Sequence, residues 1–125
     1  MKTAFVTGGS RGIGRSIALD LGKKFHVVVG FSVSNDKAEE VCKKIISNGG
    51  SSSIVQIDIS DSDSVDAAFS SIEKEYTSVD VLINNAGITK DNILPRMKED
   101  EWLEVIQTNL TGSFYTSQRA IKLMM

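Results

Sequence analysis

The segment AFVTGGSRGIG, residues 4–14, joins a short apolar run to the start of an amphipathic stretch, and the rest of the chain is organised around it. It predicts a strand, a glycine turn and the N-terminus of a helix. Gly8, Gly12 and Gly14 would let the backbone turn sharply, approach a bulky anion and pack the helix closely on its strand. Free N–H groups and the helix dipole favour phosphate at such a turn, although a glycine turn also has a purely structural interpretation.

The order of apolar strand and helical pattern repeats along the chain. The continuous apolar run at 26–31 is typical of a strand covered on both faces in a parallel sheet. The serine run 51–53 is predicted to be a turn. Further strands are expected at 3–7, 54–57 and 79–84, and helices at 11–24, from Ser34 or Asn35 to Asn48, after 60–64, and from Glu99 onward, with Ile13, Ile17, Ala18 and Leu21 on one face of the first helix.

Strands that alternate with helices imply right-handed β-α-β units and a parallel sheet. The predicted fold class is therefore α/β, the N-terminal half of a Rossmann-like doubly wound sheet with strand order 3-2-1-4. Residues 1–125 are expected to form one dinucleotide-binding domain that is incomplete at its C-terminus, because the chain stops inside a helical pattern. A ligand is expected at the carboxyl ends of the strands, near the switch between strands one and four.

Composition and charge narrow the possible functions. The net charge of −2, with interspersed signs and no basic run, argues against nucleic acid as a partner. The apolar runs are too short to span a membrane and the N-terminus does not resemble a signal peptide, so we expect a cytoplasmic protein without a membrane partner. A single cysteine, Cys42, and a single histidine, His26, argue against an internal disulfide and a metal-ligand cluster.

Four motifs in order carry a resemblance to a known family. They are Thr7-Gly8-x-x-x-Gly12-x-Gly14, Asp58 after the third strand, Asn84-Asn85-Ala86-Gly87 after the fourth, and Asn109 in the last helix. With them the whole chain resembles the short-chain dehydrogenase/reductase family. Residues 87–94, with Arg96-Met97-Lys98 and Trp102, are similar to the 3-oxoacyl-[acyl-carrier-protein] reductase subfamily.

The resemblance implies an activity and a set of partners. The implied reaction is the NADPH-dependent reduction of 3-oxoacyl thioesters in fatty acid biosynthesis, on substrates bound to acyl carrier protein. The complete protein is then expected to be a homotetramer, with the long last helix in an oligomer interface. Acetoacetyl-CoA reductase or another short-chain dehydrogenase is the alternative within the family, and a non-catalytic nucleotide-binding half domain is the alternative of another class.

The resemblance also implies roles for individual residues. Asn109 matches a catalytic asparagine whose main-chain carbonyl holds a water in the proton relay. Asp58 has a structural alternative as a helix cap, and Asn84 is expected to brace the sheet rather than touch a ligand. The implied cofactor-binding residues are Gly8, Gly9, Ser10, Arg11 and Ile13 at the phosphates, Asp58 and Ile59 at the adenine, and Asn85 and Ala86 at the ribose.

The choice between NAD and NADP depends on charge. A site that selects NAD usually places an acidic side chain on the ribose 2′-hydroxyl at the end of the second strand. That region reads Phe31-Ser32-Val33-Ser34, with no carboxylate before Asp36. Arg11 can offer its guanidinium group to a 2′-phosphate, so NADP is the expected cofactor, although Arg11 could instead be a solvated residue at a helix start.

The family's catalytic serine and Tyr-x-x-x-Lys pair are not present in these residues. Tyr115-x-x-x-Arg119 imitates the pair, but it follows Asn109 in the same helical run, and Tyr115 is interpreted as a packing residue. The 125-residue chain is therefore expected to be inactive alone, either as a fragment of a longer reductase or as a truncated product.

Overall fold

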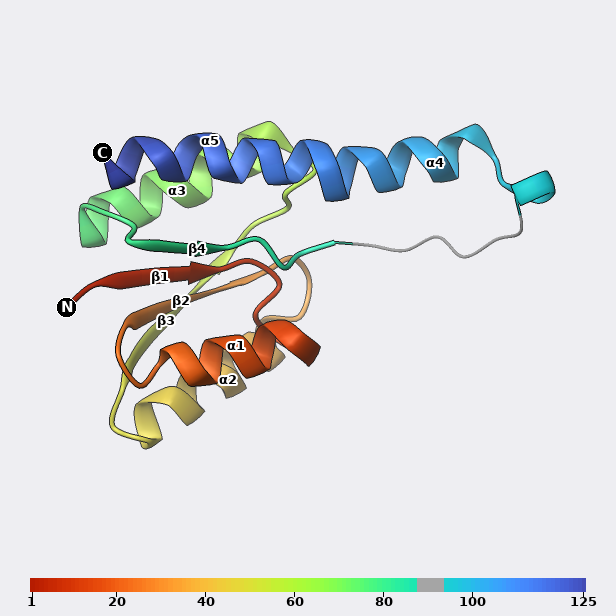
Figure 1. Cartoon of the computed structure of the whole chain (residues 1–125). Helices are drawn as coiled ribbons and strands as arrows, with labels where there is room; N and C mark the ends of the chain where they lie inside the picture. The colour runs from red at the N-terminus through yellow and green to blue at the C-terminus, as the bar shows by residue number, and fades with distance from the viewer. Residues whose placement is uncertain (88–93) are drawn as a thin grey trace.

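A computed structural model describes residues 1–87 and 94–125 of the chain (Figure 1). Strands and helices alternate from the N-terminus, and a long helical segment follows the fourth strand. The elements in order are β1 (Thr3–Val6), α1 (Gly12–Leu21), β2 (His26–Phe31), α2 (Asn35–Ser47), β3 (Ser51–Gln56), α3 (Ser62–Tyr76), β4 (Val81–Ile83), the 3-10 turn η1 (Leu94–Arg96), α4 (Glu99–Val105), the π-helical turn η2 (Ile106–Thr111) and α5 (Gly112–Met124).

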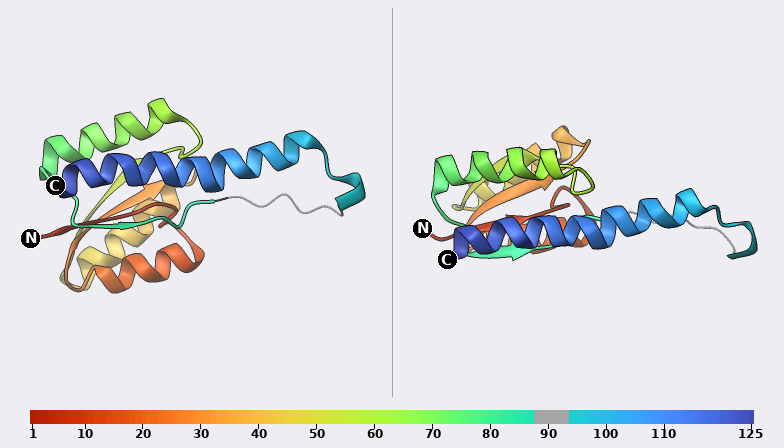
Figure 2. Two further views of the ribbon diagram at one scale, coloured as in Figure 1. Left: turned by 45° about the horizontal axis from the view of Figure 1, so that its top comes forward. Right: turned by 90° about the horizontal axis from the view of Figure 1, so that it is seen from above.

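The four strands form one sheet in the order β3-β2-β1-β4, and every neighbouring pair is parallel. This confirms the predicted α/β class and strand order. Two layers of helices cover the sheet, with α1 and α2 on one face and α3 and α5 on the other (Figures 1 and 2). Among the described residues, β4 is one edge of the sheet.

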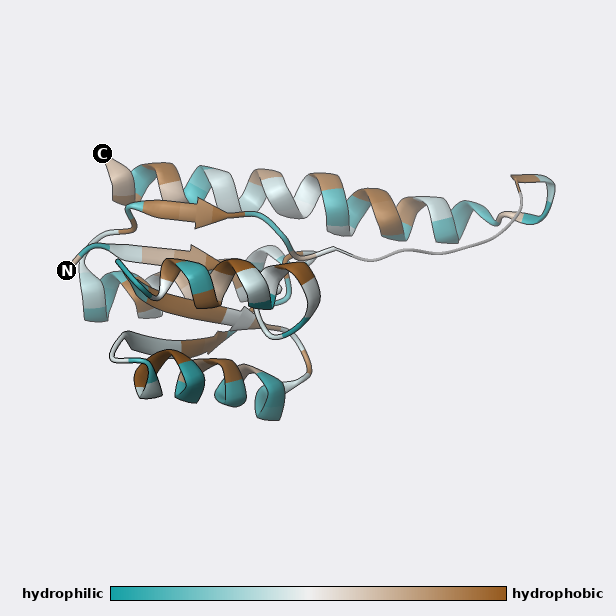
Figure 3. Ribbon diagram, turned by 60° about the horizontal axis from the view of Figure 1, so that its bottom comes forward, coloured by the Kyte–Doolittle hydropathy of each residue, from teal (hydrophilic) through white to brown (hydrophobic). Residues whose placement is uncertain are grey.

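Alternation along the strands builds a core on each side of the sheet. Phe5 and Val28 belong to the core beneath α3 and α5, where the Phe5 and Phe69 rings meet edge to face at 5.3 Å. Val6, Val27 and Val29 belong to the core beneath α1 and α2. The central strands β1 and β2 are therefore largely apolar on both faces, and Figure 3 colours most of their length brown.

Some element boundaries differ from the predictions. Ser51, Ser52 and Ser53, predicted as a turn, are the first half of β3, and they pair in register with residues 26–28 of β2. The hydroxyl of Ser52 donates to the Val27 carbonyl at 2.8 Å, and the His26 ring contacts both Ser51 Oγ and Ser53 Oγ. Their polar side chains are satisfied across the strands, which is why a serine run can form a strand here.

Helix α1 ends at Leu21, three residues before the predicted end, and β4 is shorter than the predicted strand at both ends. Ile13 was expected on the buried face of α1, but it is 75% exposed, and Gly14 and Ala18 are the buried positions of this helix. The reason is steric. The first turn of α1 faces the backbone of Gly8 at Gly14, where a β-carbon would overlap the Gly8 carbonyl oxygen, so the large side chain of Ile13 lies on another face of the helix.

The predicted long helix is present, but it is not a uniform α-helix. The turn η2 interrupts it between α4 and α5. Small residues make its buried contacts in α5, at Gly112, Thr116 and Ala120. Its large apolar residues Trp102, Leu110, Phe114 and Ile121 are each more than half exposed.

Asn84 braces the sheet, as the sequence predicted. Its Oδ1 accepts a 2.6 Å hydrogen bond from the fully buried Thr116 hydroxyl, and its Nδ2 donates to Ser117 Oγ at 3.0 Å. These bonds fix α5 over β4. Tyr115 also packs as predicted, against the core beneath α3 and α5, with its ring 5.4 Å from Cζ of Arg119.

Candidate functional site

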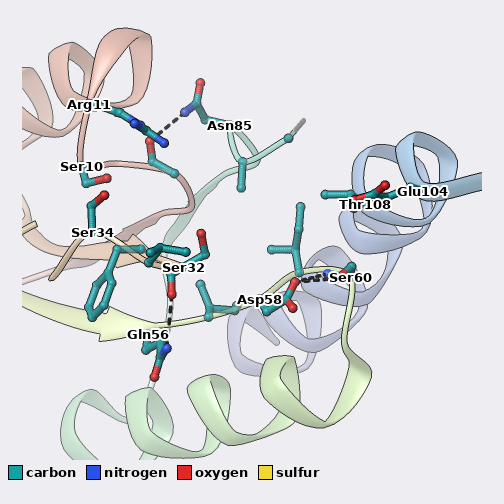
Figure 4. Close-up of a pocket in the computed structure, with 17 residues that line it drawn as sticks. Ser10, Arg11, Ser32, Ser34, Gln56, Asp58, Ser60, Asn85, Glu104 and Thr108 are labelled. Atoms are coloured by element: carbon teal, nitrogen blue, oxygen red, sulfur yellow. Dashed lines mark hydrogen bonds between the residues drawn. The ribbon is translucent and has the colours of Figure 1, made fainter. Parts of the chain in front are cut away.

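A cavity of about 570 Å³ lies at the carboxyl ends of the parallel strands (Figure 4). Its lining comes from the turn after β1, the end of β2, the loops after β3 and β4, and the long helical segment. This is the crevice where doubly wound sheets bind their ligands, and the volume is in the usual range for small-molecule sites.

The glycine turn brings the loops after β1 and β4 into close contact. Gly8 adopts a φ of +63°, and a β-carbon there would lie 2.9 Å from Cα of Ala86. A β-carbon on Gly14 would overlap the Gly8 carbonyl oxygen and the Asn85 amide. Glycine is therefore required at positions 8 and 14 because other atoms of the protein already occupy the space of a β-carbon. Gly12 differs, because its φ is +60° but, apart from its chain neighbours and the backbone of its own helix, no described protein atom lies within 4 Å of the position that a β-carbon would take.

Hydrogen bonds lock the two loops together. The Thr7 hydroxyl donates to the Ile83 carbonyl at 3.2 Å and accepts from the backbone N–H groups of Asn85 and Ala86, each at 3.1 Å. Asn85 Nδ2 donates to the Gly8 carbonyl at 3.0 Å. Asn85 and Ala86 are thereby held beside the glycine turn, where both line the cavity.

The start of α1 borders the cavity and has no side-chain cap. Arg11 occupies the N-cap position with extended backbone and makes no capping hydrogen bond through its side chain. Ser10, which is 8% exposed, and Arg11 both line the cavity. Among the described residues of the lining, Arg11 is the only cation, and the end of β2 beside it contributes Ser32 and Ser34 without a carboxylate.

The loop after β3 forms the opposite side of the cavity. Asp58 Oδ1 accepts hydrogen bonds from the N–H and the hydroxyl of Ser60, at 3.0 and 2.6 Å. The helix-cap alternative for Asp58 is wrong, because Asp61 is the N-cap of α3 and accepts from the Asp63 N–H. Asp58 and Ile59 both line the cavity, with Asp58 exposed and Ile59 buried.

Not every residue with a predicted role lines the cavity. Gly8, Ser10, Arg11, Asp58, Ile59, Asn85 and Ala86 do, whereas Gly9, Ile13 and Asn109 do not. Gly9 is buried, and its N–H donates to the Gly30 carbonyl at 3.0 Å, which is a structural role between β1 and β2. Ile13 projects into solvent on the first turn of α1.

Asn109 lies in η2, close to the loop after β4. Its Oδ1 is 3.0 Å from the position that a β-carbon on Gly87 would take, and Gly87 lines the cavity. Its main-chain carbonyl accepts a 2.8 Å hydrogen bond from the Ser113 hydroxyl. The predicted subfamily segment 87–98 is only partly visible beside it, because residues 88–93 lie outside the described residues.

The sequence assigned no role to several residues of the lining. Gln56 donates through Nε2 to the Ser32 carbonyl at 3.2 Å and so ties the end of β3 to the end of β2. Ser60, Glu104 and Thr108 also line the cavity. Glu104 and Thr108 are four residues apart in a helical pattern, so a shared face could have been noticed, but no pattern indicated that this face meets the strand ends.

Among the described residues, the groups with shifted pKa values lie away from the cavity. Burial lowers the pKa of His26, whose ring stacks on Tyr76 at 4.5 Å, and burial also raises the pKa of Tyr76. A hydrogen bond from Arg119 lowers the pKa of Asp66 on the face between α3 and α5. None of these three groups lines the cavity.

The sheet order and the position of the cavity define the class of the protein, a Rossmann-like α/β protein with its ligand crevice at the strand carboxyl ends. The family follows from comparison with known sequences, because the model of the short chain dehydrogenase family matches residues 2–125. The chain belongs to the short-chain dehydrogenase family.

Individual relatives agree with this assignment. The 3-oxoacyl-[acyl-carrier-protein] reductase FabG of Staphylococcus aureus (strain Mu50) is 48% identical over 125 residues, which cover 99% of this chain and 51% of that protein. The protein of the same name from Pseudomonas aeruginosa is 41% identical over 121 residues, covering 97% and 49%. The chain thus spans about half the length of the curated relatives it matches.

A solved structure supports the fold. A double mutant of a short-chain dehydrogenase/reductase from Serratia marcescens superposes with a TM-score of 0.93 at 30% sequence identity, over 98% of this chain and 51% of that one. Within residues 1–87 and 94–125, no helix is long and apolar enough to cross a membrane, and no group of three or more His, Cys, Asp or Glu residues is placed to hold a metal ion.

Proposed function

We propose that these residues form the cofactor-binding half of an NADPH-dependent reductase of 3-oxoacyl thioesters, acting on substrates carried by acyl carrier protein in fatty acid biosynthesis. The similarity to two proteins named 3-oxoacyl-[acyl-carrier-protein] reductase supports the reaction and the substrate class. The observation that carries the cofactor assignment is Arg11, a cation in a lining that lacks a carboxylate at the end of β2.

The residues of the cavity fit a phosphorylated dinucleotide. The glycine turn brings the N-terminus of α1 to the cavity, and because this N-terminus has no side-chain cap it leaves N–H groups for a pyrophosphate. Arg11 would bind a 2′-phosphate through charged hydrogen bonds. Asp58 would accept a hydrogen bond from the adenine amine, with Ile59 against the base.

When bound, NADPH would supply the hydride that reduces the substrate carbonyl. The part of this chain is to bind and orient the cofactor, with Asn85 and Ala86 beside the ribose. Asn109 would hold a water on its main-chain carbonyl in the proton relay. Neither Tyr76 nor Tyr115 is followed by lysine four residues later, so we assign the proton donor to neither.

Steady-state kinetics test the proposal in the protein encoded by the whole open reading frame that contains these residues. We expect turnover of acetoacetyl thioesters with NADPH, with a higher kcat/KM on acyl carrier protein than on coenzyme A. In Arg11→Ala, the kcat/KM for NADPH should fall by the factor that corresponds to the roughly 1.5–3 kcal/mol of a charged hydrogen bond, while the value for NADH changes little. Equal losses for both cofactors would contradict the assignment of Arg11, and a preference for coenzyme A would favour an acetoacetyl-CoA reductase.

A further inference from the structure

The long helical segment forms one wall of the cofactor cavity, although it belongs to a different layer from the glycine turn. Glu104 in α4 and Thr108 in η2 contribute to the lining, and Figure 4 shows them across the cavity from Ser10 and Arg11. The shape of the cavity therefore depends on how this helical segment is rotated about its axis.

That rotation is set by the π-helical turn η2. A π turn contains one residue more than an α turn, and each residue turns a helix by roughly 100°. If η2 relaxed to an α-helix while α5 stayed in place, the residues before it would rotate by about that angle. Glu104 would then leave the cavity wall. An isolated helix favours α over π geometry, so contacts with the rest of the protein must maintain the turn.

Two contacts with the loop after β3 hold η2 at its ends. Gln107 Nε2 donates a 3.0 Å hydrogen bond to the Ser60 carbonyl, 47 residues earlier in the chain. At the other end Gly112 is buried against Ile59, and a β-carbon on this glycine would come within 2.7 Å of the Ile59 carbonyl oxygen. Both contacts are made to the segment 58–60, which itself lines the cavity.

The segment 58–60 is a firm anchor. The Asp58 carboxylate accepts two hydrogen bonds from Ser60, and the Asp58 N–H donates to Ser64 Oγ at 2.9 Å in the first turn of α3. The Asp61 N–H donates to the Asp58 carbonyl at 3.1 Å. The carbonyl of Ser60 is therefore held in place by hydrogen bonds within its own loop, independently of the bond from Gln107.

We propose that Gln107 is a positioning residue, which holds η2 against the loop 58–60 and so keeps Glu104 and Thr108 in the wall of the cofactor cavity. The inference rests on the proposed function only for the identity of the ligand. It also links the two ends of the site, because the loop expected at the adenine and the turn that contains Asn109 share the hydrogen bond from Gln107 to Ser60.

The test compares the full chain with three variants at this position. Gln107→Ala removes the hydrogen-bond donor, Gln107→Glu replaces it with a group that cannot donate when ionised, and Gln107→Lys restores a donor. Gln118→Ala is the matched control, because Gln118 is also a glutamine of the long helical segment, and its side chain accepts a hydrogen bond from the adjacent Arg119 rather than contacting the loop 58–60.

Two measurements decide the outcome. Hydrogen exchange at the amides of residues 106–111 needs no ligand, and calorimetric titration gives the dissociation constant for NADPH. In Gln107→Ala and Gln107→Glu we expect both exchange and the NADPH dissociation constant to rise by roughly fivefold, the factor that one neutral hydrogen bond supplies. Gln107→Lys should recover most of the loss, and the melting temperature of Gln107→Ala should fall by no more than the few degrees that one neutral hydrogen bond supplies.

The proposal is overturned if Gln107→Ala exchanges and binds like the parent chain, or if Gln118→Ala changes both quantities equally. A lower melting temperature with unchanged exchange and NADPH affinity also overturns it, since that result means a role in stability alone. If the parent chain binds no NADPH, the proposed function fails, but hydrogen exchange still decides whether Gln107 holds η2.

Discussion

Replacing Gly14 by alanine tests the packing of the glycine turn. The new β-carbon would overlap the Gly8 carbonyl oxygen and the Asn85 amide, and it would lie 2.9 Å from the Gly8 carbonyl carbon, where ordinary contact is 3.4–4 Å. The obstacle is backbone, and moving it also breaks the hydrogen bond from Asn85 to Gly8. The helix cannot simply slide away, because Ala18 on the same face is fully buried.

The expected loss follows from these contacts. Overpacking costs about 1–3 kcal/mol and the broken hydrogen bond about 0.5–1.5 kcal/mol, whereas alanine gains about 1 kcal/mol over glycine in a helix interior. We expect a net loss of about 2 kcal/mol in the free energy of unfolding, which lowers the melting temperature by roughly 5–10 °C in a chain of this size. The NADPH dissociation constant should rise as well, because Asn85 and Gly8 both line the cavity.

Denaturant unfolding, with NADPH titration of the same samples, measures both effects. Gly49→Ala is the matched control. Unlike Gly14, Gly49 has a left-handed backbone, with φ of +91°, and apart from its chain neighbours no described atom lies within 4 Å of its β-position; it stands at the end of α2, outside the residues of the cavity lining. It should lose about 1–2 kcal/mol of stability without loss of NADPH affinity. A Gly14→Ala chain that is more stable than the parent would refute the reasoning, since only helix propensity would then be acting.

Substitutions at three further positions test the rest of the fold. Thr116→Val leaves Asn84 Oδ1 without its 2.6 Å donor, and we expect about 1–3 kcal/mol of destabilisation by thermal melting; no loss would mean that water replaces the hydroxyl. Asp61→Ala removes the N-cap bond to Asp63 and should cost about 1 kcal/mol of unfolding free energy, whereas Asp61→Asn should cost much less. Burial lowers the pKa of His26 from its ordinary value of 6.5, so the unfolded chain binds more protons between the lowered pKa and 6.5, and stability should rise with pH across that interval and level off above it. In His26→Gln this part of the pH dependence should disappear, and an unchanged profile would exclude His26 as its source.

The sequence predicted the sheet because local and long-range signals agree. The run at 26–31 is rich in valine and almost wholly apolar, which favours a strand covered on both faces, and the glycine turn identified the first strand and helix. The prediction of a turn at 51–53 was wrong because the suitability of these serines for a strand depends on His26 and Val27, which lie 25 residues earlier. A turn signal taken from local composition cannot include such partners.

Some residues of the cavity lining could be predicted from the sequence and others could not. Residues that follow a strand directly, such as Asp58 and Asn85, could be placed at the crevice from topology alone. Gln56 could not, because its role depends on the distance to the Ser32 carbonyl. Glu104 and Thr108 also could not, since a helix drawn with ideal α geometry through 99–124 has no π turn and presents a different face before residue 106.

Calorimetric titration of the full chain with NADPH and with NADH tests the central claim most directly, because it measures the cofactor site without requiring turnover. We expect saturable binding of one NADPH per chain, weaker binding of NADH, and loss of the difference between the two cofactors in Arg11→Ala. Equal affinity for NADPH and NADH in the parent chain, or no binding of either, would contradict the proposed cofactor site.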